Sequence, residues 1–289
     1  MENKSFSVYV TWTEVFLCFL IIGLNILGLF RFTLKHKNKG HHFTMLYVKL
    51  AFETAFASCK IAYNSFVLLD SFQVLTNVKY VFYSGVLIRT FMSLMGFISL
   101  FIALDRLVAM KKPIRYAQSD AKKIQKVSVT FLGTAFPALY LVYALTRHTP
   151  PKPSFMVNEL YDYNVSITLH TCSMAAFLIS IFISVLFLYQ FKQFMDNLND
   201  HLPRGQVSDI KLANNIVIAQ IIAEFILILC PYVAEKVVMM TTGVAISAII
   251  GPIFHPLHVL YVAFCSTAFC LISARKKKGN SVQRFTSSK

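Results

Sequence analysis

Seven long apolar stretches are the feature of this sequence that most restricts its fold. Each has about the 20 residues that an α-helix needs to cross the hydrocarbon core of a bilayer. They run from Val8 to Phe32, Phe43 to Leu69, Tyr80 to Met110, Val127 to Leu145, Ile167 to Phe191, Leu212 to Ala234 and Gly243 to Ile272. Three charged residues, Lys49, Glu53 and Lys60, interrupt the second stretch. The sequence therefore predicts an all-α bundle of seven transmembrane helices over residues 1–272, followed by a basic tail over residues 273–289.

The overall composition agrees with a membrane protein. Of the 289 residues, 56% are hydrophobic and 14% are charged, and the mean hydropathy is +0.59. A soluble domain has a charged fraction of about 25%. The formal net charge of +15 would indicate a nucleic-acid partner in a soluble chain, so its interpretation depends on where the charges lie.

Lysine and arginine residues gather in alternate connections between the apolar stretches. If the N-terminus is outside, 19 of them fall in cytoplasmic segments and 5 in outer segments. This excess follows the positive-inside rule, so the sequence predicts an outer N-terminus and a cytoplasmic C-terminus. The basic charge is then a topology signal that also attracts anionic lipid of the bilayer, and we expect no nucleic-acid partner.

Sequence motifs for catalysis, metal binding and disulfide pairing are missing. The six cysteines fall inside apolar stretches without paired spacing, which predicts neither a zinc site nor a disulfide framework. His255 and His258 could share a metal ion, but no third ligand is spaced nearby. No nucleophile motif or phosphate loop appears, so we expect no enzyme and no cofactor.

Three positions are candidates for covalent modification. Asn3 and Asn164 begin glycosylation sequons, and both lie outside in the predicted topology. Cys270 is a palmitoylation candidate because it lies close to the inner face and to the basic tail. The first apolar stretch is long enough to span and lacks a small-residue cleavage site, so no cleavable signal peptide is expected.

The third apolar stretch carries two arginines. Arg89 interrupts its first part, and Asp105-Arg106 lies near its end, before a basic connection. Charges in a membrane helix are costly unless they lie at the water boundary or face protein, so these positions indicate function. Between the arginines, small or polar residues recur at steps of three and four and predict a face that packs on protein, at Ser93, Gly96, Ser99 and Ala103.

Several local motifs resemble those of the rhodopsin-like G protein-coupled receptor superfamily. Asp105-Arg106-Leu107 resembles the Asp-Arg-Tyr motif of the third helix, with leucine in place of tyrosine. Cys230-Pro231 resembles the proline bend of the sixth helix. The other matches are Gly23-Leu24-Asn25 in the first helix, Pro113-Ile114 in the second inner loop, and His255-Pro256 with Tyr261 as a degraded Asn-Pro motif in the last helix.

Within this superfamily, the short loops and the segment from Tyr47 to Glu53 resemble the nematode serpentine chemoreceptors, class BC in particular. The resemblance implies a receptor in the plasma membrane, in the cilia of sensory neurons. Its partners would be a small environmental molecule and a heterotrimeric G protein, and a receptor oligomer is left open. One departure from the receptor plan is that residues 72–89 and 146–166 hold no cysteine to tie the third helix to the second outer loop.

The resemblance implies a switch at the inner end of the third helix. Arg106 would pair with Asp105 in the resting state and be freed on activation to meet the G protein. Lys111 and Lys112 would belong to the same coupling face. The alternative is an interfacial arginine that only obeys the positive-inside rule.

Arg89 lies 17 residues before Arg106, about 25 Å along the helix axis, at the depth of a receptor ligand pocket. A buried arginine there suits a carboxylate or another electron-rich ligand. Snorkelling to the outer surface or pairing with an acidic neighbour is the alternative. Ser93 and Glu224 are the other ligand-binding candidates. Glu224 shares a helix face with Gln220 and could instead be a neutral acid hydrogen-bonded across helices.

An internal polar cluster is predicted from Asn25 and Glu53. We expect Glu53 to pair with Lys49, four residues earlier on the same face, and less readily with Lys60. A switch or a cation site at Glu53 is the alternative. The predicted helix hinges are Pro231 and Pro256.

A membrane channel or transporter is the alternative function. It would need a polar path across the bundle, for which Glu53, Lys60, Arg89 and Glu224 are the candidates. The sequence contains no internal repeat, whereas inverted repeats are common in transporters, so we prefer the receptor.

Overall fold

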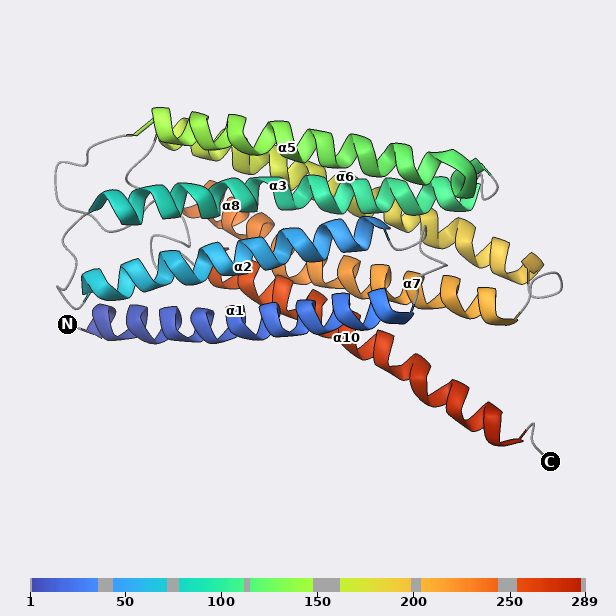
Figure 1. The fold of residues 1–289 in the computed structure, drawn as a ribbon. Coiled ribbons are helices and arrows are strands. Elements are labelled where there is room, and N and C mark those ends of the chain that lie inside the picture. The colour runs from blue at the N-terminus through green and yellow to red at the C-terminus, as the bar shows by residue number, and fades with distance from the viewer. Residues whose placement is uncertain are drawn as a thin grey trace.

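The computed structural model of this chain is an all-helical bundle (Figure 1). It describes residues 2–35, 44–71, 78–111, 115–147, 162–198, 204–243 and 254–286. Seven helical rods occupy these residues, which confirms the predicted fold class.

Five of the rods are the α-helices α1 (Glu2–Lys35), α2 (Thr44–Ser71), α3 (Val78–Lys111), α6 (Tyr163–Leu198) and α10 (Phe254–Thr286). The fourth rod begins as the short π-helix η2 (Tyr116–Asp120) and continues as α5 (Ala121–Leu145). The sixth rod is continuous through three segments, α7 (Arg204–Ala223), the π-helix η4 (Glu224–Leu229) and α8 (Cys230–Thr242).

Six of the rods contain a segment long and apolar enough to cross a membrane. The exception is α2, which carries Lys49, Glu53 and Lys60. Large apolar side chains such as Phe16 and Phe182 are exposed on the surface of the bundle, as expected for helices that face lipid. The start of α1 and the end of α10 lie at opposite ends of the bundle, which an odd number of crossings requires (Figure 1).

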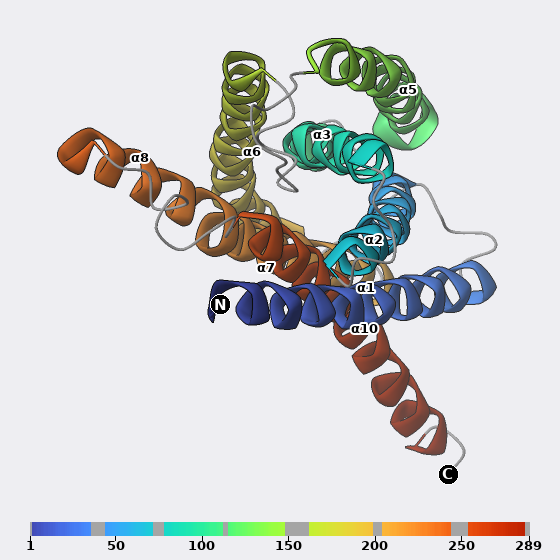
Figure 2. The same cartoon turned by 90° about the vertical axis from the view of Figure 1, so that its left-hand side faces the viewer.

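Helix α3 lies in contact with α2, α5 and α6 (Figure 2). Its small residues permit this position because they let neighbouring backbones approach closely. A Cβ atom at Gly96 would overlap the backbone carbonyl oxygen of Ser173 in α6. Ser173 Oγ also donates a hydrogen bond to the carbonyl oxygen of Met92, 3.3 Å away. The predicted small-residue face therefore packs on α6 at this level.

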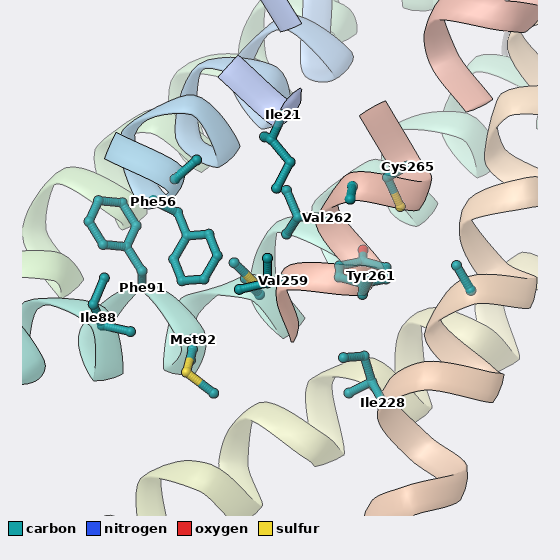
Figure 3. Packing of buried hydrophobic residues seen from close by; sticks show 14 of the residues in the cluster. Ile21, Phe56, Ile88, Phe91, Met92, Ile228, Val259, Tyr261, Val262 and Cys265 are labelled. Carbon is teal, nitrogen blue, oxygen red and sulfur yellow. The ribbon is translucent and has the colours of Figure 1, made fainter. Parts of the chain in front are cut away.

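Aromatic and aliphatic side chains from several rods form the main apolar core (Figure 3). The ring of Phe91 in α3 lies edge-on to those of Phe52 and Phe136, with centroids 4.8 and 4.9 Å away. Such aromatic pairs contribute about 0.5–1.5 kcal/mol beyond their buried area. Phe56 and Val259 belong to the same core, which joins α3 to α2 and α10.

The sixth rod changes helix type at η4 because of a proline. Pro231 lacks an N–H group, and its ring crowds the carbonyl group four residues earlier, at Leu227. A π-helical turn accommodates this break in the α-helical ladder, and such turns occur often at functional sites. Pro256 lies in the first turn of α10 as described, where a missing N–H costs no bond within the helix. The hinge roles of both prolines stay predictions.

Substituting Gly96 with alanine is expected to lower the apparent unfolding temperature of the purified protein by several degrees. The added Cβ atom must push α3 away from α6, and overpacking of this kind costs about 1–3 kcal/mol. Gly133→Ala is the matched control, because a Cβ atom there has no neighbour within 4 Å. Equal unfolding temperatures for the two variants would show that the close approach at Gly96 does not determine stability.

Candidate functional site

Asp105 and Arg106 form an ion pair near the end of α3. Arg106 Nη2 lies 3.7 Å from Asp105 Oδ2, and both side chains are at most 5% exposed. The hydroxyl group of Tyr116 in η2 donates a hydrogen bond to Asp105 Oδ1, 2.8 Å away. The predicted Asp105–Arg106 pair is thus confirmed, and Tyr116 is a partner that sequence reasoning missed. We refer to these three residues as the inner cluster.

The hydroxyl group of Tyr116 is a stable hydrogen-bond donor in this cluster. Burial and the adjacent carboxylate of Asp105 raise the pKa of Tyr116, so the hydroxyl stays protonated at physiological pH. Of the other residues assigned to the coupling face, Lys111 is exposed at the end of α3. Lys112 lies outside the described residues.

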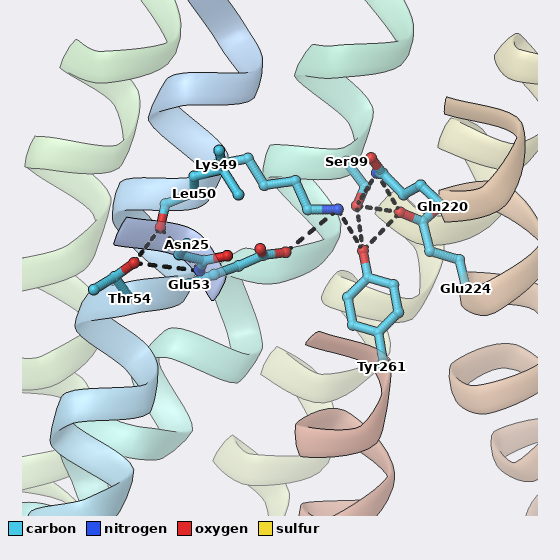
Figure 4. A network of polar contacts seen from close by, with 9 residues as sticks. All are labelled: Asn25, Lys49, Leu50, Glu53, Thr54, Ser99, Gln220, Glu224 and Tyr261. Carbon is cyan, nitrogen blue, oxygen red and sulfur yellow. Dashed lines mark hydrogen bonds and ion pairs between the residues drawn. The ribbon is translucent and has the colours of Figure 1, made fainter. Parts of the chain in front are cut away.

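Glu224 lies in a polar network between α3, the sixth rod and α10 (Figure 4). Its Oε1 atom accepts hydrogen bonds from Ser99 Oγ, from Gln220 Nε2 at 2.7 Å and from the hydroxyl group of Tyr261 at 2.9 Å. Gln220 and Glu224 therefore share a face, as predicted. Because the side chain of Glu224 is buried at the level of the membrane, these donors replace the water that a carboxylate would otherwise bind.

Lys49 connects this network to α2 (Figure 4). Its Nζ atom donates to the hydroxyl oxygen of Tyr261 over 3.1 Å and lies 3.4 Å from Glu53 Oε1. The ammonium group also lies 5.1 Å from the centre of the Tyr261 ring. The predicted pair between Lys49 and Glu53 is confirmed. We refer to the whole set as the central network, which consists of Lys49, Glu53, Ser99, Gln220, Glu224 and Tyr261.

Asn25 lies beside the central network but is bonded to other groups. Its Nδ2 atom donates to the carbonyl oxygen of Leu50 at 3.4 Å and to Thr54 Oγ1 at 3.2 Å. These bonds join α1 to α2. Asn25 and Glu53 are therefore neighbours in the same layer of the bundle without a hydrogen bond between them in the described residues (Figure 4).

A second ion pair lies in the outer half of the bundle. Lys60 Nζ lies 3.0 Å from Glu14 Oε2, and Asn64 Nδ2 donates to the same oxygen at 3.0 Å. Lys60 thus pairs with Glu14 in α1. Sequence reasoning missed Glu14, although the rule that an acid inside an apolar stretch needs a protein partner would have found it.

Arg89 lies in the outer half, within electrostatic range of three histidines. These are His170 in α6 and His255 and His258 in α10. His258 is 1% exposed, and its Nδ1 atom lies 2.8 Å from the carbonyl oxygen of Phe254. We refer to Arg89 and the three histidines as the outer cluster. Sequence reasoning missed His170 because nothing in its local sequence connects it to α10.

Aromatic rings border the outer cluster. The ring of His170 is edge-on to Tyr232 in α8 and to Phe254 in α10, at centroid distances of 5.1 and 5.9 Å. Lys236 Nζ lies 5.6 Å from the centre of the Tyr232 ring and within electrostatic range of His170. The arrangement combines cationic groups, imidazoles and apolar rings at the junction of α3, α6, α8 and α10.

The other two predicted ligand-binding residues have hydrogen-bond partners outside the outer cluster. Ser93 Oγ lies 3.0 Å from the hydroxyl oxygen of Tyr143, so it joins α3 to α5. Glu224 belongs to the central network. Arg89 and Ser93 lie four residues apart on α3, and the ligand-binding role of Arg89, Ser93 and Glu224 stays a prediction.

The modification candidates differ in their surroundings. Asn164 is exposed in the first turn of α6. Asn3 lies in the first turn of α1, and its side chain is outside the described part of the structure. Cys270 is buried, and its Sγ atom lies 3.1 Å from the carbonyl oxygen of Leu24. An acyl chain on Cys270 would break this contact with α1, so its placement disfavours palmitoylation.

The polar residues proposed for a channel fall into separate clusters. Lys60 pairs with Glu14, Glu53 and Glu224 belong to the central network, and Arg89 lies in the outer cluster. Among the side chains that the structure describes, no group of three or more His, Cys, Asp or Glu residues could hold a metal ion. The arrangement thus resembles stacked internal contacts more than a continuous polar path.

Residues 4–145, from the first turn of α1 to the end of α5, match the model of the serpentine type 7TM GPCR chemoreceptor family Srbc. A comparison with curated proteins gave no match. The family match confirms the predicted resemblance to serpentine chemoreceptors, the seven-helix membrane fold and the expectation of a receptor that is not an enzyme.

Tyr116→Phe is expected to lower the apparent unfolding temperature of the purified protein. The variant removes the hydroxyl donor to Asp105 and keeps the ring, and a hydrogen bond to a charged group contributes about 1.5–3 kcal/mol. Tyr189→Phe, which removes a hydroxyl group from an exposed ring, is the control in the same thermal scan. No difference between the two variants would contradict a structural role for the Tyr116 hydroxyl group.

Proposed function

We propose that this chain, which belongs to the serpentine 7TM GPCR chemoreceptor family Srbc, detects a small molecule outside the cell and activates a heterotrimeric G protein. The observation that carries this proposal is the inner cluster. A buried arginine, held by the acid beside it and at the end of the helix expected to face the cytoplasm, is a group that can be exposed to a partner.

The proposed coupling face is centred on Arg106. Its guanidinium group is permanently charged and planar, which suits a new set of hydrogen bonds to a protein partner. Tyr116 satisfies one oxygen of Asp105, so the aspartate keeps a donor when the arginine leaves. Lys111 and Lys112 are proposed to add positive charge around it.

The proposed moving part is the sixth rod. Glu224 lies in η4 and Pro231 lies at the start of α8, so the break in helix type separates an inner from an outer half. A ligand that binds the active arrangement more tightly shifts the population towards it, and the inner half of the rod moves outward.

The proposed ligand site is the outer cluster. Arg89 and Lys236 supply positive charge, and the rings of Tyr232 and Phe254 supply apolar surface. A small carboxylate with an apolar body fits this combination, because the guanidinium group binds carboxylates through two parallel hydrogen bonds. The site requires the N-terminus to be outside, in the plasma membrane, and by family resemblance in the cilia of sensory neurons.

Arg106→Ala is expected to abolish G-protein activation while cell-surface expression stays near that of the wild type. The readouts are a second-messenger assay and surface labelling of the same cells. Arg147→Ala is the control, since Arg147 is exposed at the opposite end of the fourth rod. Unchanged signalling by the Arg106 variant would exclude the proposed coupling face.

Small carboxylic acids are expected to activate the receptor at lower concentrations than their methyl esters. Arg89→Gln should raise the half-maximal concentration of an active acid by about tenfold or more, the equivalent of one charge-assisted hydrogen bond. Its effect on any active ester should be much smaller. Activation by neutral compounds alone, unaffected by Arg89→Gln, would contradict the proposed ligand site and leave the coupling face untouched.

A further inference from the structure

The central network buries one more acid than base. Lys49, Glu53 and Glu224 are each at most 5% exposed. The groups that face them in the described residues carry no formal charge at neutral pH, and they are Ser99 from α3, Gln220 from α7, and Tyr261 and Cys265 from α10. With both acids ionised, the network would hold a net charge of −1 inside the membrane. Such a charge is costly, and one bound proton removes it.

Hydrogen bonding distinguishes the two carboxyl groups (Figure 4). Glu224 Oε1 accepts from three donors, which stabilises the ionised form. Glu224 lacks a hydrogen-bond partner at Oε2 alone, whereas neither oxygen of Glu53 has a conventional hydrogen bond in the described residues. The polar contact of Glu53 there is Lys49 Nζ, 3.4 Å away. Glu53 is therefore the less supported anion and the better place for the proton.

A small cavity lies beside Glu53. Its volume is about 20 Å³, and its lining is mostly apolar, with Lys49, Glu53 and Gln220 among the residues around it. A space of this size holds about one water molecule, which needs two or more polar partners. A water there would accept the hydrogen bond of a protonated Glu53, and Glu224 does not line the cavity.

We propose that Glu53 is a neutral acid and Glu224 a carboxylate in this arrangement, and that the proton passes from Glu53 to Glu224 on activation. The O–H bond of Glu53 breaks as its proton passes to Lys49 Nζ, Lys49 passes one proton to the hydroxyl oxygen of Tyr261, and Tyr261 passes its own proton to Glu224, where the new O–H bond forms. No other reactant is consumed, and the charge of the network is unchanged. The proton transfer rests on the proposed receptor function. The protonation of Glu53 in the arrangement described here, which we refer to as the closed arrangement, does not.

This proton transfer avoids a poorly supported buried charge on Glu224 when the sixth rod moves. When η4 moves outward, Glu224 loses its hydrogen bonds from Ser99 and Tyr261, because these residues belong to other rods. It keeps the hydrogen bond from Gln220, which moves with it. An ionised Glu224 would then be a poorly supported buried charge. As a neutral acid it can leave, while Lys49 pairs with the newly ionised Glu53, already 3.4 Å away.

Two glutamine variants are expected to change ligand-free activation of the G protein in opposite directions. Glu224→Gln imitates the neutral acid of the active arrangement and should raise basal nucleotide exchange about fivefold or more, the low end of typical coupling between sites. Glu53→Gln cannot release a proton and should reduce basal exchange below that of the wild type. Glu235→Gln, on the same rod outside the network, should leave it unchanged. An equal loss of basal nucleotide exchange in Glu224→Gln and Glu53→Gln would mean that the network is only structural. It would overturn the proton transfer.

Infrared spectroscopy of the purified, ligand-free protein tests the proton independently of signalling. The wild type should show a protonated-carboxyl C=O band, and both Glu53→Gln and Glu224→Gln should remove it, because either substitution leaves one acid to balance the charge of Lys49. Glu53→Gln should also unfold close to the wild-type temperature, because Lys49 keeps Glu224 as its counterion. A band that persists in either variant, or a large destabilisation by Glu53→Gln, would overturn the assignment. Failure of all variants and the wild type to activate a G protein would instead refute the proposed function.

Discussion

Lipid around the bundle forces each buried charge to find its partner within the protein, and this constraint arranges the helices. Apolar side chains gain little by exchanging lipid for protein, so polar contacts and close packing decide which helices lie together. Glu14 and Lys60 join α1 to α2, and the central network joins α2 and α3 to the sixth rod and α10. The inner cluster then fixes η2 against α3.

Helix α3 contributes residues to both the central network and the inner cluster, and these residues lie close together along its axis. Ser99 belongs to the central network and Asp105 to the inner cluster, six residues or about 9 Å further along the axis. A shift of Glu224 that removes the hydrogen bond from Ser99 therefore occurs less than two helical turns from the Asp105–Arg106 pair. Gly96 holds the same segment of α3 tightly against α6, so α3 can act as the fixed element against which the sixth rod moves.

The sequence alone predicted the parts of this arrangement that depend on local spacing. Apolar length predicted the rods, and steps of one or four residues predicted Asp105–Arg106, Lys49–Glu53 and Gln220–Glu224. The sequence alone did not predict the contacts that depend on how the rods face each other. Tyr116 looks like an ordinary aromatic residue, and Tyr261 looks only like part of a degraded motif, until the fold brings each of them to an acid. Tyr143 in α5 is likewise a partner of Ser93 that the sequence does not predict.

The nature of the donors separates the contacts that the proposed mechanism breaks from those that it keeps. Glu14 has a lysine partner on another helix, and separating them would leave two buried charges. Glu224, in contrast, is held by two hydroxyl groups and an amide, so its departure leaves only neutral donors behind. Asp105 is similar, since its partner from another segment is the hydroxyl group of Tyr116. Neutral donors therefore stabilise the closed arrangement at the two levels where movement is proposed, without making that movement prohibitively costly.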